Sequence, residues 1–146
     1  MKKIFALLAL SLVTVSARAA LFINNNASYD VVVVLWAHDS NHPAPCSYYC
    51  QRFNVPSGTS MAFNNVTSGG LLWGQPWNIP ATLVTSGSGF DAADIVPSTS
   101  LLPYNTIGNP GSCAATTSYS AAASGYSINA SWLPLGGNNV MLDITN

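Results

Sequence analysis

The last part of the chain alternates between apolar and polar residues with a period of two. Residues 126–132 follow this pattern, residues 136–139 form a turn-prone Gly-Gly-Asn-Asn run, and residues 140–145 alternate again. Successive side chains of a β-strand point to opposite faces, whereas a helix repeats every 3.6 residues. The pattern therefore predicts an antiparallel hairpin over residues 126–145.

Earlier segments also have the composition of strands. The run Val31–Trp36 is apolar on both faces and rich in β-branched residues, which indicates a strand that is covered on both sides and central in its sheet. Further strand candidates are 21–23, followed by a turn-prone Asn24–Asn26, a hairpin formed by 52–55 and 60–63 around Pro56–Thr59, and shorter strands at 81–85 and 94–96.

The pattern favours an all-β fold. No segment has the signature of a capped amphipathic helix, and the Ala-rich stretch 114–124 contains enough Ser and Thr to be a weak helix at best. We expect one domain, a β-sandwich of about seven or eight mostly antiparallel strands, with a small β-barrel as the alternative.

The first nineteen residues resemble a secretory signal peptide. Two lysines precede an apolar run, and Ala17-Arg18-Ala19 offers small residues at the cleavage positions. The start of this leader has a bacterial character, and the apolar run is too short for a membrane anchor. We therefore expect a signal peptide over 1–19 and a secreted or periplasmic β-sandwich domain over 20–146, with no membrane span in the mature chain.

Charged residues are scarce beyond the leader. Arg52 is the only Lys or Arg of residues 20–146. The same residues contain five Asp, so their net charge is −4. Without a basic patch, counterion release cannot drive nucleic-acid binding. Without lysine, a Schiff base and a phosphate-binding P-loop are excluded. The carboxylates belong to Asp30, Asp39, Asp91, Asp94 and Asp143.

The three cysteines all lie in the exported part, where oxidising surroundings favour a disulfide. Cys46 and Cys50 enclose a loop of only three residues, so we expect them to bond to each other. Cys113 would then be free, buried or bonded to another chain. A long-range bridge to Cys113 is the alternative, and it would restrict the unfolded chain more strongly.

Metal-capable residues recur every four positions between residues 38 and 50, at His38, His42, Cys46 and Cys50, with Asp39 beside the first. On a helix this spacing would place four ligands on one face. Pro43 and Pro45 break such a helix. We therefore expect a stapled loop without metal, with a site built on His38, Asp39 and His42 as the minor possibility.

Two carboxylates near a turn, Asp91 and Asp94, could contribute to a calcium site, but stabilisation of the turn is the simpler role. The Gly-x-Ser-x-Gly motif of a nucleophilic serine is absent from the sequence. We expect neither a catalytic residue nor a cofactor.

The segment 69–78 is the candidate ligand-binding loop. It contains two tryptophans in a Gly- and Pro-rich context, and an exposed indole can stack on a sugar ring or fill a partner's pocket. Packing in or beside the core is the alternative. The predicted contacts are Trp73, Gln75, Trp77 and Asn78.

These observations favour a secreted, non-enzymatic binding or surface-structural module. Abundant Ser, Thr and Asn suit hydrogen bonding to carbohydrate or to another protein subunit, and the low charge leaves strand edges able to self-associate. The alternative is an extracellular metal-binding protein or enzyme that uses His38, Asp39 and His42.

Overall fold

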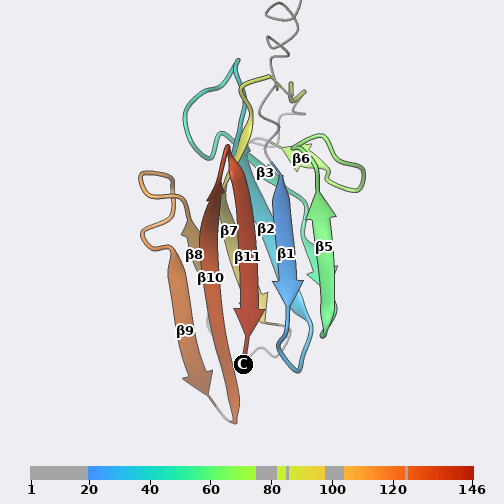
Figure 1. The fold of residues 1–146 in the computed structure, drawn as a ribbon, viewed down its shortest axis with the longest axis vertical. Coiled ribbons are helices and arrows are strands. Elements are labelled where there is room, and N and C mark those ends of the chain that lie inside the picture. The colour runs from blue at the N-terminus through green and yellow to red at the C-terminus, as the bar shows by residue number, and fades with distance from the viewer. Residues whose placement is uncertain (1–19, 75–81, 85, 98–103, 124) are drawn as a thin grey trace, which may run out of the picture.

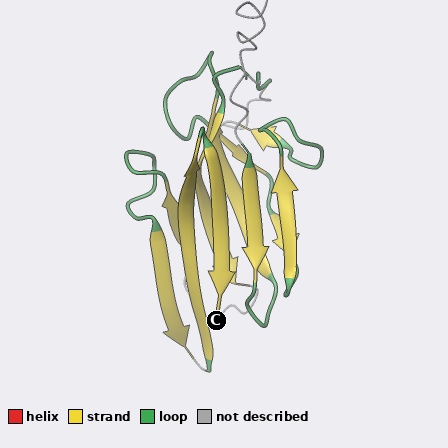
Figure 2. Ribbon diagram, viewed as in Figure 1, coloured by secondary structure: helices red, strands yellow, loops and turns green. Residues whose placement is uncertain are grey.

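The protein is an all-β sandwich in a computed structural model (Figure 1), which describes residues 20–74, 82–84, 86–97, 104–123 and 125–146. Strands and loops account for all of these residues (Figure 2). Eleven strands of the described residues form two facing sheets, so the predicted all-β sandwich is confirmed, with more strands than expected. The predicted leader, residues 1–19, lies outside the described residues.

The first sheet, sheet A, has five strands in the order β5-β1-β11-β10-β9. The hairpin predicted over 126–145 is confirmed, because β10 and β11 pair antiparallel from Asn129↔Thr145 to Gly136↔Asn139. The pair β1–β11 is parallel, and the other pairs are antiparallel. The bounds are β1 Leu21–Asn25, β5 Thr59–Phe63, β9 Ser118–Ala123, β10 Tyr126–Gly136 and β11 Asn139–Thr145.

The second sheet, sheet B, has the order β6-β3-β2-β7-β8, and β4 also pairs with β2. The Val-rich strand β2 is central, as predicted, with β3 and β4 on one side and β7 on the other. The bounds are β2 Val31–His38, β3 Tyr48–Cys50, β4 Phe53–Val55, β6 Trp73–Gly74, β7 Gly89–Pro97 and β8 Asn105–Gly108.

The core lies between the two sheets and follows the period-two pattern. The odd-numbered residues of β2 point into it, so the even-numbered ones, including Val34 and Trp36, lie on the outer face of sheet B. In sheet A, Trp132 is the largest of the fully buried side chains. The core also contains Leu21, Ile23, Val31, Val33, Leu35, Phe90, Ile95, Ile107, Ile128, Leu142 and Ile144.

The predicted hairpin around Pro56–Thr59 is wrong. Strand β4 pairs in sheet B and β5 pairs in sheet A, so this turn crosses from one sheet to the other. Asn25 stabilises the crossing: its buried side-chain amide donates to the Val55 carbonyl at 2.9 Å, and its backbone carbonyl accepts the Gly58 N–H at 2.8 Å. A residue far away in the sequence therefore holds both ends of this turn.

Three shorter expectations also need correction. Strand β1 continues through Asn25 instead of turning at Asn24. Residues 82–84 are not in a strand, and 81 and 85 lie outside the described residues. The Ala-rich stretch contains strand β9, because its side chains pack on β10 in regular antiparallel register. Burial of Tyr119 on the core side outweighed the local helical preference of the alanines.

A β-bulge interrupts the pairing of β2 with β7 at Asp91. Trp36 pairs with Ala92 and Ala37 with Phe90, so Asp91 is the extra residue. Asn109 binds the bulge, because its N–H donates to the Asp91 carbonyl at 2.7 Å and its side-chain amide donates to the Phe90 carbonyl at 2.9 Å. The neighbouring strand approaches so closely that a Cβ on Gly108 would lie 2.4 Å from the Asp91 carbonyl oxygen.

We expect Gly108→Ala to lower the free energy of unfolding by about 1–3 kcal/mol, because the added methyl group must push the bulge and β8 apart. Urea unfolding measures the effect. The matched control is Gly69→Ala, since nothing lies within 4 Å of a Cβ at that position. Equal stability of the two variants would contradict the close approach at the bulge.

Candidate functional site

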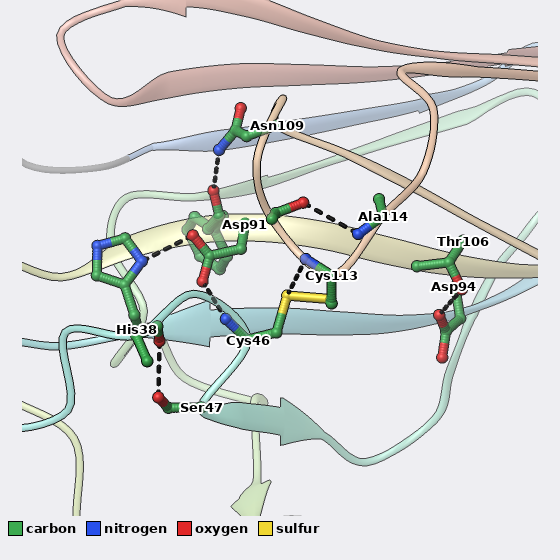
Figure 3. Close-up of a disulfide and its surroundings, with 12 residues drawn as sticks. His38, Cys46, Ser47, Asp91, Asp94, Thr106, Asn109, Cys113 and Ala114 are labelled. Atoms are coloured by element: carbon green, nitrogen blue, oxygen red, sulfur yellow. Dashed lines mark hydrogen bonds and ion pairs between the residues drawn. A yellow bond between two sulfur atoms is a disulfide. The ribbon is translucent and has the colours of Figure 1, made fainter.

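A buried carboxylate at the bulge is the centre of a polar cluster (Figure 3). Asp91 is 3% exposed. Its Oδ1 lies 2.7 Å from Nδ1 of His38, the last residue of β2, and its Oδ2 accepts the Cys46 N–H at 2.8 Å. Burial raises the pKa of Asp91, while the Cys46 N–H and the His38 ring act against that rise. The bulge thus positions one carboxylate between a histidine and the disulfide loop.

The predicted disulfide Cys46–Cys50 is wrong. The structure pairs Cys46 with Cys113, and Figure 3 shows this bridge beside Asp91. Cys50 is a buried free thiol in β3, where its Sγ accepts the Leu35 N–H at 3.0 Å. Burial raises the pKa of Cys50 to about 11. The short separation in sequence did not decide the pairing, because β3 buries Cys50 in the core while Cys46 belongs to a loop beside Cys113.

A second carboxylate organises the loop that follows β2. Asp39 is fully buried, and its Oδ1 accepts the His42 N–H at 2.8 Å and lies 3.2 Å from Nδ1 of His42. The Tyr48 hydroxyl also contacts that nitrogen. Burial acts to raise the pKa of Asp39, but hydrogen bonds from the Val84 and His42 N–H groups bring it below its usual value. This arrangement stabilises the loop.

The structure does not combine His38, Asp39 and His42 into one metal centre. Each histidine contacts a different carboxylate: His38 contacts Asp91 and His42 contacts Asp39. Within the described part of the chain, no three His, Cys, Asp or Glu side chains lie close enough together to bind a metal ion. Asp91 and Asp94 have different hydrogen-bond partners. Asp91 contacts His38 and Cys46, whereas the Asp94 Oδ1 accepts the Thr106 hydroxyl at 2.7 Å.

A shallow groove on the outer face of sheet B, here called the sheet-B groove, is the best candidate for a ligand site. It has a volume of about 280 Å³ and is lined by Val34, Trp36, Tyr49, Cys50, Gln51, Arg52 and Asp94. The Trp36 and Tyr49 rings pack with their centroids 5.5 Å apart and their planes tilted by 51°. The exposed Arg52 forms no ion pair with any carboxylate of the described residues.

The indole nitrogen of Trp36 adds a second feature to this groove. It is buried, and among the described residues it is the one buried side-chain donor or acceptor without a hydrogen-bond partner. Leaving a buried donor unpaired costs about 1–3 kcal/mol. Such an exception is rare in a folded protein.

The predicted ligand loop falls mostly outside the described residues, which include Trp73 but not Gln75, Trp77 or Asn78. Trp73 begins β6 and is half-buried. Its indole N–H donates to the Val66 carbonyl at 2.6 Å, and its ring packs on Phe90 with centroids 6.3 Å apart. This side chain is anchored at the rim of the core, so the contacts predicted for the loop stay a prediction.

Sequence reasoning did not identify Trp36 and Tyr49 as site residues. Trp36 ends an apolar run, and such a run indicates a strand that is covered on both faces. The run therefore gives no sign that one face of this strand lines the sheet-B groove. Arg52 was a usable signal for a site, since it is the one Lys or Arg of residues 20–146. Arg52 and Asp94 line the same groove because β3 and β4, which flank Arg52, and β7, which contains Asp94, all pair with β2.

The fold and the cluster around Asp91 define a disulfide-bonded protein of the β-sandwich class. In comparisons with protein-family models, curated proteins and solved structures, nothing matched this chain. Within the described residues, no helix is long and apolar enough to cross a membrane. A disulfide is typical of oxidising surroundings, so the bridge is compatible with an extracellular location.

Proposed function

We propose that this chain is an exported, non-enzymatic binding module that takes a neutral carbohydrate in the sheet-B groove. The observation that supports this most strongly is the composition of the groove, which combines an aromatic pair, one guanidinium, one carboxylate and one amide. Sugar recognition uses these groups together, because rings have apolar faces that pack on aromatics and hydroxyls that need both donors and acceptors.

The charges in the groove favour a neutral ligand. Arg52 and Asp94 are its charged residues and carry opposite signs, so an added carboxylate or ammonium group would be attracted by one and repelled by the other. Hydroxyl groups can instead donate to the carboxylate and accept from the guanidinium. Val34 and the aromatic pair supply the apolar contact area beside them.

The absence of a second carboxylate in the groove lining favours binding over hydrolysis. Most glycosidases use two Asp or Glu residues on either side of the scissile bond, about 5–10 Å apart. Asp94 is the one carboxylate that lines this groove. A module that binds sugar without cleaving it needs only the complementary surface.

Export supports the same proposal. The N-terminal leader predicts secretion or release to the periplasm, where carbohydrates of a cell surface or matrix are the accessible polymers. Uncharged polar side chains in place of lysine and glutamate also suit a protein that contacts hydroxyl-rich surfaces. The proposed ligand therefore belongs to the compartment that the sequence predicts.

We expect Arg52→Ala to weaken binding of a neutral glycan about tenfold or more, because a charge-assisted hydrogen bond contributes about 1.5–3 kcal/mol. Stability should not change, because Arg52 is exposed and forms no ion pair with a described carboxylate. A glycan array identifies the ligand, and isothermal titration calorimetry then measures the affinity of each variant.

The matched control is Tyr104→Ala, which removes an aromatic ring that is 63% exposed and does not line the groove. This variant should bind like the wild type. The proposal fails if the array shows no neutral glycan, or if Arg52→Ala binds with unchanged affinity.

A further inference from the structure

A second cavity lies at one end of the sandwich, where β2 ends, β7 begins and the β10–β11 turn closes over them. It has a volume of about 240 Å³. Its polar lining includes His38, Asn109 and Asn138, and its apolar lining includes Phe90, Pro134 and Val140. None of these residues lines the sheet-B groove, so this cavity is a separate place for a ligand.

The His38 ring in this cavity is held in one orientation. Nδ1 lies 2.7 Å from Asp91 Oδ1, and Asp91 is itself held by the Cys46 N–H. The ring rests against Gly89, where a Cβ would lie 2.9 Å from its Cε1 atom. A larger residue at position 89 would displace the ring. The surrounding chain thus positions the imidazole before any ligand arrives.

The contact with Asp91 also determines which nitrogen of His38 has the proton. An ionised carboxylate accepts hydrogen bonds and cannot donate, so Nδ1 of a neutral ring must be the N–H. The lone pair is then on Nε2. No hydrogen bond joins Nε2 to another described residue, although the ring lines the cavity.

We propose that this cavity binds a small neutral molecule that has a hydroxyl or N–H donor on a compact apolar body, with the donor directed at His38 Nε2. The acceptor is preorganised by Asp91, and Phe90, Pro134 and Val140 surround the apolar part. The side chain of Asn109 is not available to the ligand, because its Oδ1 accepts the Trp132 indole N–H and its amide donates to Phe90. His38 Nε2 is therefore the acceptor at which we place the donor of the ligand, beside the Asn138 and Asn139 residues that also line the cavity.

Phenol and anisole are suitable probes, because they have similar shapes and only phenol can donate a hydrogen bond. Both compounds are titrated in the same mildly alkaline buffer. Phenol should shift the ¹⁵N resonance of His38 Nε2, leave His42 unchanged and bind about three- to tenfold more tightly than anisole. The chain has two histidines, so His42 is an internal control for non-specific effects.

Two variants test the role of the acceptor. Asp91→Asn must use its carbonyl to accept the Cys46 N–H, so its NH₂ faces His38 Nδ1 and drives the ring proton to Nε2. The preference for phenol over anisole should then fall to about one. His38→Phe keeps a ring and removes the acceptor, and it should lose the same preference even if Asp91→Asn does not fold.

The proposal is overturned if phenol leaves the wild-type His38 Nε2 resonance unchanged, if His42 responds equally, or if His38→Phe keeps the preference for phenol. The wild-type measurement alone is decisive, since it needs no variant to fold. None of these results depends on glycan binding in the sheet-B groove.

Discussion

Replacing Cys46 and Cys113 together by Ala should lower the free energy of unfolding by about 4 kcal/mol. The two cysteines are 67 residues apart in sequence, and a bridge that closes a loop of this length restricts the unfolded chain strongly. The bridge also holds the loops on either side of the Asp91 bulge, because the Cys113 N–H contacts Cys46 Sγ at 3.3 Å. Urea unfolding of the oxidised protein measures the loss.

Reduction provides the control for this experiment. A thiol reductant should destabilise the wild type to about the level of the double variant and leave the double variant unchanged, because Cys50 forms no bridge. Peptide mapping without reductant should join the fragments that contain Cys46 and Cys113. A fragment that joins Cys46 to Cys50 would contradict the structure.

Trp132→Ala should lower the free energy of unfolding by about 3–5 kcal/mol, the usual cost of truncating a fully buried large aromatic residue. Trp132 is 1% exposed in the centre of the core, and its indole N–H donates to the Asn109 Oδ1 at 2.9 Å. Loss of the indole leaves a cavity between the sheets. It also removes the hydrogen bond that holds Asn109, the residue that contacts the bulge. Thermal and urea unfolding both measure the change.

Two further substitutions separate the contributions to this effect. Trp132→Phe keeps most of the volume and removes the N–H, so it should cost about 1–3 kcal/mol, mainly because the Asn109 oxygen loses its partner. Leu133→Ala removes an exposed side chain on the opposite face of the same strand and should change stability little. If all three variants were equally stable, the burial of Trp132 would be contradicted.

Local patterns were sufficient for the class of fold and for some elements. The period-two alternation predicted the β10–β11 hairpin, because one buried face and one exposed face require it. The density of β-branched residues in Val31–Trp36 predicted a strand that is central in its sheet and covered on both sides. Its central position is confirmed, whereas its even-numbered residues lie on the outer face of sheet B, where Val34 and Trp36 line a groove. Both inferences depend on the side chains of one segment and on nothing far away.

The connections between segments were not predictable in the same way. Pro56–Thr59 has the composition of a hairpin turn, yet it connects strands of two different sheets. Asn25, about thirty residues earlier, stabilises this connection by hydrogen bonds to Val55 and Gly58. Likewise, Cys46 and Cys50 are neighbours in sequence, and the burial of Cys50 in β3 leaves Cys113 as the partner. Sequence proximity is a poor guide where three-dimensional packing orients the side chains.

The sequence by itself determined the all-β class of this chain, because alternation and composition act locally along the chain. Only the tertiary structure decided where its chemistry lies. Pairing of β2 with β3, β4 and β7 placed Arg52, which lies between β3 and β4, in one groove with Asp94. The bulge turned Asp91 toward His38. The residues brought together in this way are about forty or more positions apart in sequence. They depend on strand order and register, which the whole core selects and no single segment encodes.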